Sequence, residues 1–448
     1  MRLLSLLSAL IFIAGCGGDG SHASRSNFKP VEASYDLTEP NSLATVINVT
    51  DATLHINLGS NPKSLYVVTT SHFDNQPISV NNKKSSRVLN ESNETLDSNP
   101  KNSDSVVKRV MQFREQTFKL LRVGSSSSDE SYERLTPQNR ASQGATASFC
   151  VDMDSNYNCK RQINATAIRV KSTIATAQGD KSLVIWLQDG LSIKSSSLDN
   201  LSDTFLKSGL NNDIYDWETN IYSKEWGDDA KDVDSHLIAN DNTIDILVYN
   251  MYNSGVAGFY WPKDNFKKSF LAASNERVMF YVNANLLATD EKETFTTLDH
   301  EFQHMIHFYQ RAILKDIHDD TWFNEMLSEA TEDLLATKIA YKGPRNVDPN
   351  DGSAGSGNNK KGRYPSFNAH NTLSLTQWGN GVAHYGKVSA FGTYLLRNYG
   401  GAKLLHELMK SSIYDKEALL EATGVDDFHT LIHNWGCAVV LSDKTNIE

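Results

Sequence analysis

The sequence of 448 residues lacks an excess of basic side chains, since 43 lysines and arginines are outnumbered by 54 aspartates and glutamates and the formal net charge is −11. A nucleic-acid-binding protein normally needs a basic stripe, so the charge balance argues against that class. Hydrophobic residues make up only 39% of the chain. Because each membrane-spanning helix needs about 20 mostly apolar residues, this composition excludes a polytopic membrane protein. It is typical of a soluble globular chain with roughly two to four domains and some polar, poorly packed segments.

Cysteine is scarce, with four residues in the whole chain: Cys16, Cys150, Cys159 and Cys437. None of them belongs to a C-x-x-C pair, so a zinc site built from cysteines is not expected. Cys150 and Cys159 bracket a short polar loop rich in turn-forming residues. In an exported protein this spacing predicts a local disulfide that leaves Cys437 unpaired, although another connectivity stays open.

A long hydrophobic run is also missing, and the longest apolar stretch lies at the N-terminus, in MRLLSLLSALIFIAGC. Residues 1–15 are too short for a comfortable bilayer span and are typical of a signal peptide. The end of the stretch, Ile13-Ala14-Gly15-Cys16, resembles the lipobox of bacterial lipoproteins, with isoleucine in place of the usual leucine. The resemblance implies lipid modification of Cys16 and a membrane-anchored, exported protein, and Gly17 favours the outer membrane or cell surface over the inner membrane. An ordinary secretory signal, with Cys16 merely near the cleavage site, is the alternative.

The next segments differ in composition. Residues 16–27 are rich in glycine and serine and predict a flexible tether. Residues 28–80 contain short alternating and β-branched runs, which predict a small β-rich module. Residues 81–148 are polar and predict a mostly disordered linker. Within it, Val106–Leu121 has apolar residues near helical spacing, and this short helix either docks on the following domain or is the remnant of a pro-segment.

From residue 149 to residue 448 the pattern is that of one globular domain. Apolar runs at Leu183–Leu187, Ile244–Tyr249 and Val278–Val282 predict strands, and helical patterns dominate from Thr294 onward. The expected fold class is therefore α+β.

One helical pattern contains an H-E-x-x-H motif, formed by His300-Glu301-Phe302-Gln303-His304. Two histidines one helical turn apart can aim their ring nitrogens at a single cation. Glu301 is rotated away from that line, so it can reach a water molecule instead of the cation. The motif alone is only moderately specific, and a polar helix face is the alternative interpretation. The apolar residues on the opposite side of the same helix favour the metal site.

A second acidic helix follows. Glu325 is separated from His304 by enough chain for the rest of one helix, a turn and the start of an antiparallel helix. A catalytic zinc site needs three protein ligands and one open position, and Glu325 would complete such a set with His300 and His304. Glu329, one turn further on, is placed to accept the outer N–H of a ligand histidine and fix its tautomer.

The combination of H-E-x-x-H with the later string NEMLSE resembles the gluzincin metallopeptidases, and LDHEFQHMIHF with WFNEMLSEATEDL resembles more narrowly the hyicolysin family of secreted bacterial neutral metallopeptidases. The stretches Asp232–Phe266 and Tyr385–Gly400 agree with that family, whereas the N-terminal 150 residues are not covered. Met326 stands where many gluzincins have glycine or alanine. The resemblance implies a gluzincin-type domain, with a mixed sheet followed by a helical lobe.

The resemblance also implies a function, the hydrolysis of protein or peptide substrates at internal bonds. One catalytic Zn²⁺ would be held by His300, His304 and Glu325, and Glu301 would be the general base. Tyr385 is slightly favoured over His384 as the donor to the oxyanion. The alternatives are an aminopeptidase, for which no acidic anchor for a substrate amine is found upstream of His300, and a surface adhesin or binding lipoprotein with an inert site.

Two further groups of residues are candidates for metal binding. A three-histidine zinc site would need a glycine turn after the motif, where this chain has His307 and Gln310, so His307 is expected beside the site or on the surface. Asp228, Asp229, Asp232 and Asp234 could bind Ca²⁺. Their spacing does not match an EF-hand loop, and a solvated acidic loop is the favoured interpretation.

Overall fold

The structure is a computed structural model. Before residue 141 it describes residues 7–15, 31–36, 43–47, 52–57, 63–71, 109–110 and 113–114, and afterwards residues 141–441 except 210–211, 241, 252–255, 340, 342, 345–361 and 380. The chain forms two compact units. One comprises Met1–Glu94, Thr372–Gln377 and Leu419–Glu448, and the other comprises Thr95–Asn371 and Trp378–Ala418. Among the described residues, no helix is both long and apolar enough to cross a membrane.

The first unit contains short strands paired in parallel. One sheet has the order β3-β1-β5 and another pairs β2 with β4. Its elements are β1 (Leu7–Gly15), β2 (Val31–Asp36), β3 (Leu43–Ile47), β4 (Ala52–Asn57), β5 (Lys63–Ser71) and α12 (Phe428–Leu441). Strands β2 to β5 fall within the predicted β-rich region 28–80. Leu7–Gly15, which belong to the apolar run predicted to be a signal peptide, form the central strand β1. Its removal on export stays a prediction.

The second unit is built on a six-stranded mixed sheet of order β10-β11-β9-β8-β7-β6. Strands β8, β9 and β11 are parallel neighbours, whereas β6, β7 and β10 pair antiparallel with theirs. The three predicted strands lie within or overlap β8, β9 and β11, which are almost entirely buried and therefore read as continuous apolar runs. The strands are β6 (Thr146–Met153), β7 (Cys159–Thr176), β8 (Gly179–Gln188), β9 (Thr243–Tyr249), β10 (Gly258–Tyr260) and β11 (Met279–Asn283).

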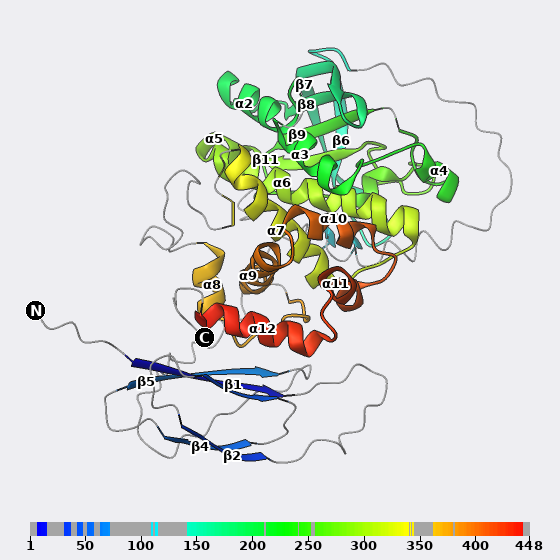
Figure 1. Cartoon of the computed structure of the whole chain (residues 1–448). Helices are drawn as coiled ribbons and strands as arrows, with labels where there is room; N and C mark the ends of the chain where they lie inside the picture. Colours follow the sequence, from blue (N-terminus) through cyan, green and yellow to red (C-terminus); the bar gives the residue numbers. More distant parts are fainter. Residues whose placement is uncertain are drawn as a thin grey trace, which may run out of the picture. The chain divides into compact units, whose positions relative to one another are not determined.

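Helices make up most of the rest of this unit, so the mixed sheet and helical lobe agree with the predicted fold class. Helix α6 contacts β10 and β11 on one side and α7 on another, and Figure 1 shows it between the sheet and the helices α7 and α9. The described helices are α2 (Ser195–Phe205), α3 (Ile214–Tyr222), α4 (Asp229–Val233), η2 (Pro262–Asn265), α5 (Ala284–Thr289), α6 (Glu291–His307), the π-helical turn η3 (Phe308–Ile313), α7 (Thr321–Ile339), α8 (Arg363–Ala369), α9 (Val382–Asn398), α10 (Ala402–Lys410) and α11 (Asp415–Thr423), whose last residues belong to the first unit.

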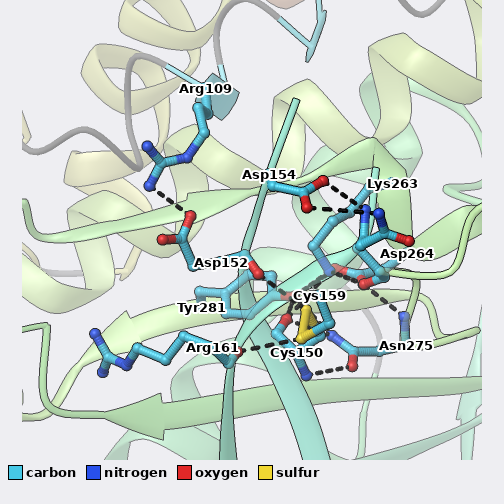
Figure 2. The surroundings of a disulfide bond; sticks show 12 residues. Arg109, Cys150, Asp152, Asp154, Cys159, Arg161, Lys263, Asp264, Asn275 and Tyr281 are labelled. Carbon is cyan, nitrogen blue, oxygen red and sulfur yellow. Dashed lines mark hydrogen bonds and ion pairs between the residues drawn. A yellow bond between two sulfur atoms is a disulfide. The ribbon is translucent and has the colours of Figure 1, made fainter. Parts of the chain in front are cut away.

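The predicted local disulfide is present. Cys150 and Cys159 are bonded, with their Cα atoms 5.7 Å apart, and close the hairpin between β6 and β7 (Figure 2). The carboxylate of Asp154 accepts hydrogen bonds from the backbone N–H groups of Asn156 and Asn158 at 2.8 and 2.9 Å, which fixes the turn. Among the described cysteines, Cys437 is free, as expected.

Candidate active site

Helix α6 carries the H-E-x-x-H motif, and its own sequence fixes how it is presented. The Asp290 side chain caps the helix by accepting from the N–H of Glu293, and acidic residues in the first turn suit the positive end of the helix dipole. Phe302, inside the motif, is fully buried and lies 5.2 to 5.8 Å from the rings of Phe205, Tyr215 and Phe280. Because this aromatic cluster fixes the rotation of α6, the two motif histidines are directed towards α7.

The three predicted metal ligands come together between α6 and α7. The Nε2 atoms of His300 and His304 are 3.0 Å apart, and the Oε2 atom of Glu325 lies 3.1 Å from the first and 3.4 Å from the second. All three side chains are buried. Donors bound to one tetrahedral zinc ion at about 2.0–2.1 Å lie about 3.3 Å from one another. The donor set and its spacing therefore fit a single ion of this kind.

The outer nitrogens of the two histidines are also bonded. The Nδ1 of His300 lies 2.6 Å from the carboxylate of Glu332, and the Nδ1 of His304 lies 3.0 Å from the Oδ1 of Asn324. Both partners are hydrogen-bond acceptors, so each Nδ1 donates, and each Nε2 faces the centre of the site as the atom that can bind an ion once it carries no proton. This arrangement, with the tautomer fixed from outside, is typical of metal-binding histidines.

The carboxylate at His300 differs from the one expected. Sequence spacing suggested Glu329, but the bonded residue is Glu332, and Glu329 instead holds the guanidinium of Arg363 at 2.8 to 2.9 Å. The reason is helical geometry. At about 100° per residue, Glu332 lies about 20° from the direction of Glu325 around α7, whereas Glu329 lies about 40° away on the other side. The small difference in rotation sends Glu329 towards α8.

The electrostatics of the site favour a cation. Burial lowers the pKa of His300, but hydrogen bonds with Glu325 and Glu332 outweigh burial and hold this pKa well above its usual value. Burial raises the pKa of Glu325, yet the charges and hydrogen bonds of His304 and His300 keep it well below the usual range. The site thus stabilises positive charge between His300 and Glu325. Because a ligand imidazole must be neutral, an ion bound there would displace the proton from His300.

Glu301 lies beside this ligand set and is nearly buried. Its Oε2 atom accepts a hydrogen bond from the backbone N–H of Tyr260 at 2.8 Å and another from the guanidinium of Arg114 at 2.7 Å. Tyr260 ends β10, one of the two edge strands of the mixed sheet as described. The carboxylate is therefore positioned by the sheet on which α6 packs.

Comparison with known proteins places the chain in a family. The family model of peptidase M30 matches residues 163–426, which include α6, α7 and α9. The chain belongs to the peptidase M30 family. It is also similar to the neutral metalloprotease ShpI of Staphylococcus hyicus, with 22% identity over 352 residues that cover 74% of this chain and 73% of that protein. Together with the site geometry, the family and this relative support a metallopeptidase function.

In this M30 peptidase, Tyr385 at the start of α9 lies next to the ligand set. Its ring centroid is 6.1 Å from that of His300, and the guanidinium of Arg363 lies over the ring at 5.0 Å from the centroid. Burial and the charges of Glu325 and Glu301 raise the pKa of Tyr385 well above its usual value, so its hydroxyl stays protonated and can donate a hydrogen bond. The ring of the other candidate, His384, lies 5.6 Å from that of Trp378, and the Tyr385 ring lies 5.1 Å from the same tryptophan.

The remaining candidates are placed outside the ligand set. His307 is buried, not on the surface, and its Nε2 lies 2.9 Å from the carboxylate of Asp319. In the acidic segment around α4, Asp234 is bonded to His236 at 2.7 Å and Asp229 lies 3.6 Å from Lys224. This segment is not among the groups of potential metal ligands found in the described part of the chain. Cys16 lies outside the described residues.

A cavity of about 240 Å³ adjoins the site. Its walls include His304, Asn324 and Glu325 from the ligand region, together with Tyr260 from the edge strand and Arg114. The H-E-x-x-H motif and the second acidic helix were visible in the sequence. No sequence pattern pointed to Tyr260, Arg114 or Glu332 as residues of the site. Only the helical spacing of Val106–Leu121 indicated that the segment containing Arg114 could dock on the domain.

Proposed function

We propose that this protein is a zinc-dependent endopeptidase that hydrolyses internal peptide bonds of protein or peptide substrates. The observation that carries the proposal is the set of three buried donor atoms, from His300, His304 and Glu325, at the mutual distances that one tetrahedral ion requires. When bound there, zinc polarises the scissile carbonyl and lowers the pKa of water to about 7. Zinc is preferred because two imidazoles and one carboxylate are a known ligand set of catalytic zinc sites.

The chain's own residues supply the proton transfers. Glu301 takes a proton from the attacking water and delivers it to the leaving amine, which is the role of a general acid–base group held within hydrogen-bond reach of the reaction. The backbone N–H of Tyr260 orients this carboxylate. Tyr385 donates its hydroxyl proton in a hydrogen bond to the carbonyl oxygen as negative charge develops on it. Burial keeps this hydroxyl neutral, so the donor is available over the physiological pH range.

The edge strand β10 supports the binding of extended peptides. An edge strand has backbone groups that can pair with an added strand, and this mode suits any internal segment of a substrate. Because the strand ends at Tyr260, beside Glu301, a peptide paired with β10 would pass directly by the general base. This position favours internal cleavage over removal of N-terminal residues.

The test is the hydrolysis of fluorescently labelled casein by the purified full chain, compared with Glu301→Gln and His300→Ala. We expect about stoichiometric zinc in the wild type and in Glu301→Gln, a large loss of zinc in His300→Ala, and loss of hydrolysis in both variants. A Glu301→Gln variant that stays active would contradict the mechanism. A carefully purified wild type without zinc and without activity would favour the inert binding protein.

We also propose, from the N-terminal sequence alone, that the protein is an exported bacterial lipoprotein anchored through Cys16, at the outer membrane or cell surface. Incorporation of labelled palmitate into the wild type but not into Cys16→Ala, together with loss of the variant from the membrane fraction, is the expected result. Equal membrane association of the two proteins would refute the lipid anchor.

A further inference from the structure

A short helical segment upstream of the family-matched region is packed into the catalytic unit. Its described residues are Arg109, Val110, Phe113 and Arg114. Val110 and Phe113 are only 2% and 3% exposed, and the Phe113 ring lies edge-on to those of Tyr157 and Phe266, at 6.2 and 6.4 Å. Residues three apart share one face of a helix. The segment is therefore anchored to the domain through an apolar face.

A second anchor is electrostatic. The guanidinium of Arg109 forms an ion pair with Asp152, which Figure 2 shows close to the disulfide. Asp152 lies in β6, where the pairing with β7 is irregular and the disulfide from Cys150 to Cys159 closes the hairpin. The hairpin thus holds Asp152 in place as the docking point for Arg109.

Between these anchors and the site lies Arg114, whose side chain is only 16% exposed. One of its terminal nitrogens donates to the carboxylate of Glu301 and to the backbone carbonyl of Tyr260, both at 2.7 Å. The other terminal nitrogen is 3.9 Å from the carboxylate of Glu325. A single guanidinium therefore contacts the general base, the end of the edge strand and the vicinity of the metal ligands.

Each of these contacts opposes catalysis. The Glu301 oxygen that accepts from Arg114 is already engaged, so it is not free to accept a hydrogen bond from an attacking water molecule. The Tyr260 carbonyl, which a peptide paired with β10 would need, is already bonded. A fixed positive charge close to Glu325 repels a divalent cation in the same site.

We propose that the segment 109–114 is an autoinhibitory element of this peptidase, with Arg114 as the residue that blocks the active site. The inference rests on the proposed function, because a blocked site implies a working one. Activation then requires displacement of this segment from its contacts with Tyr157, Phe266 and the end of the edge strand. The segment acts as an internal competitor of substrate, since it occupies the position of the substrate without presenting a scissile bond to Glu301.

The experiment compares the full-length wild type with Arg114→Ala, Phe113→Asp and a control, Arg169→Ala. Arg169 forms an ion pair with Asp199 and donates hydrogen bonds to the backbone carbonyls of Ile168 and Ser195, and none of these residues belongs to the active site. Its substitution therefore removes an arginine without affecting the block. We expect at least about a tenfold rise in kcat/KM for casein in Arg114→Ala, a similar rise in Phe113→Asp, and no change in Arg169→Ala. Melting temperatures identify any variant that fails to fold.

Two further measurements do not depend on the activity of the full-length enzyme. Zinc affinity, measured by competition with a chromophoric chelator, is expected to rise in Arg114→Ala. A synthetic peptide with the sequence of residues 106–121 is expected to bind the Arg114→Ala protein and protect its active-site region from hydrogen exchange, whereas a peptide with alanine at position 114 binds more weakly.

Lower kcat/KM in Arg114→Ala would overturn the proposal and assign Arg114 to the catalytic machinery instead. Unchanged kcat/KM together with unchanged zinc affinity would also overturn it. If no variant hydrolyses casein, the proposed function fails, but the zinc and peptide measurements still decide whether the segment blocks the site.

Discussion

The contact between Glu332 and His300 gives the sharpest prediction, because it distinguishes two carboxylates on the same helix. The carboxylate of Glu332 accepts from the Nδ1 of His300 at 2.6 Å, and both groups are buried. Loss of such a partner of a ligand histidine typically costs 10- to 100-fold in metal affinity, or about 1.4 to 2.7 kcal/mol. Glu332→Gln keeps a neutral acceptor, so zinc affinity should fall by about tenfold, the lower limit of this range. Glu332→Leu removes the acceptor, so zinc affinity should fall by about 100-fold, the upper limit.

The matched control is Glu329→Gln, one turn closer to the proposed ligand Glu325. Glu329 is fully buried and bonded to Arg363. Its substitution should therefore lower the melting temperature, because it breaks a largely buried ion pair, and affect zinc affinity less than either Glu332 variant does. The assay is competition of each apo-protein with a chromophoric chelator for zinc, with folding checked by circular dichroism. Wild-type zinc affinity in Glu332→Leu, or a larger loss in Glu329→Gln, would refute the assignment of Glu332 as the residue that orients His300.

Two other predictions use residues of α9. Tyr385→Phe removes the proposed oxyanion donor and should lower kcat about 10²- to 10³-fold with unchanged zinc content; kcat within a factor of three of the wild type would exclude this role. Lys387 is buried, and burial lowers its pKa to about 8, below the value of about 10.4 in the unfolded chain. The unfolded state therefore binds more protons between about pH 8 and pH 10, and the free energy of unfolding should rise with pH in this window. Lys387→Met should remove this rise and increase the free energy of unfolding at pH 7 by up to about 3 kcal/mol, as measured by urea unfolding. If the free energy of unfolding changes with pH in the same way in both proteins, Lys387 is not the cause of the rise.

Local features of the sequence predicted the elements that depend on local geometry. The ring nitrogens of His300 and His304 can meet at one point because the two residues are one helical turn apart. Strands β8, β9 and β11 could be predicted because buried parallel strands need continuous apolar runs. The disulfide joins cysteines separated by a short turn. In each case the residues involved lie close together along the chain, so the sequence pattern alone predicts the feature.

Features that depend on the rotation or docking of whole elements needed the tertiary structure. The choice between Glu329 and Glu332 depends on a small difference in rotation about the axis of α7, which sequence spacing does not determine. Arg114 reaches Glu301 from a polar region that composition alone described as a linker, because only the packing of Val110 and Phe113 brings it there. Tyr260 meets Glu301 because α6 packs on the edge strand. The sequence by itself predicted the proposed metal ligands and the proposed general base, whereas long-range packing decided which residues surround, orient and contact them.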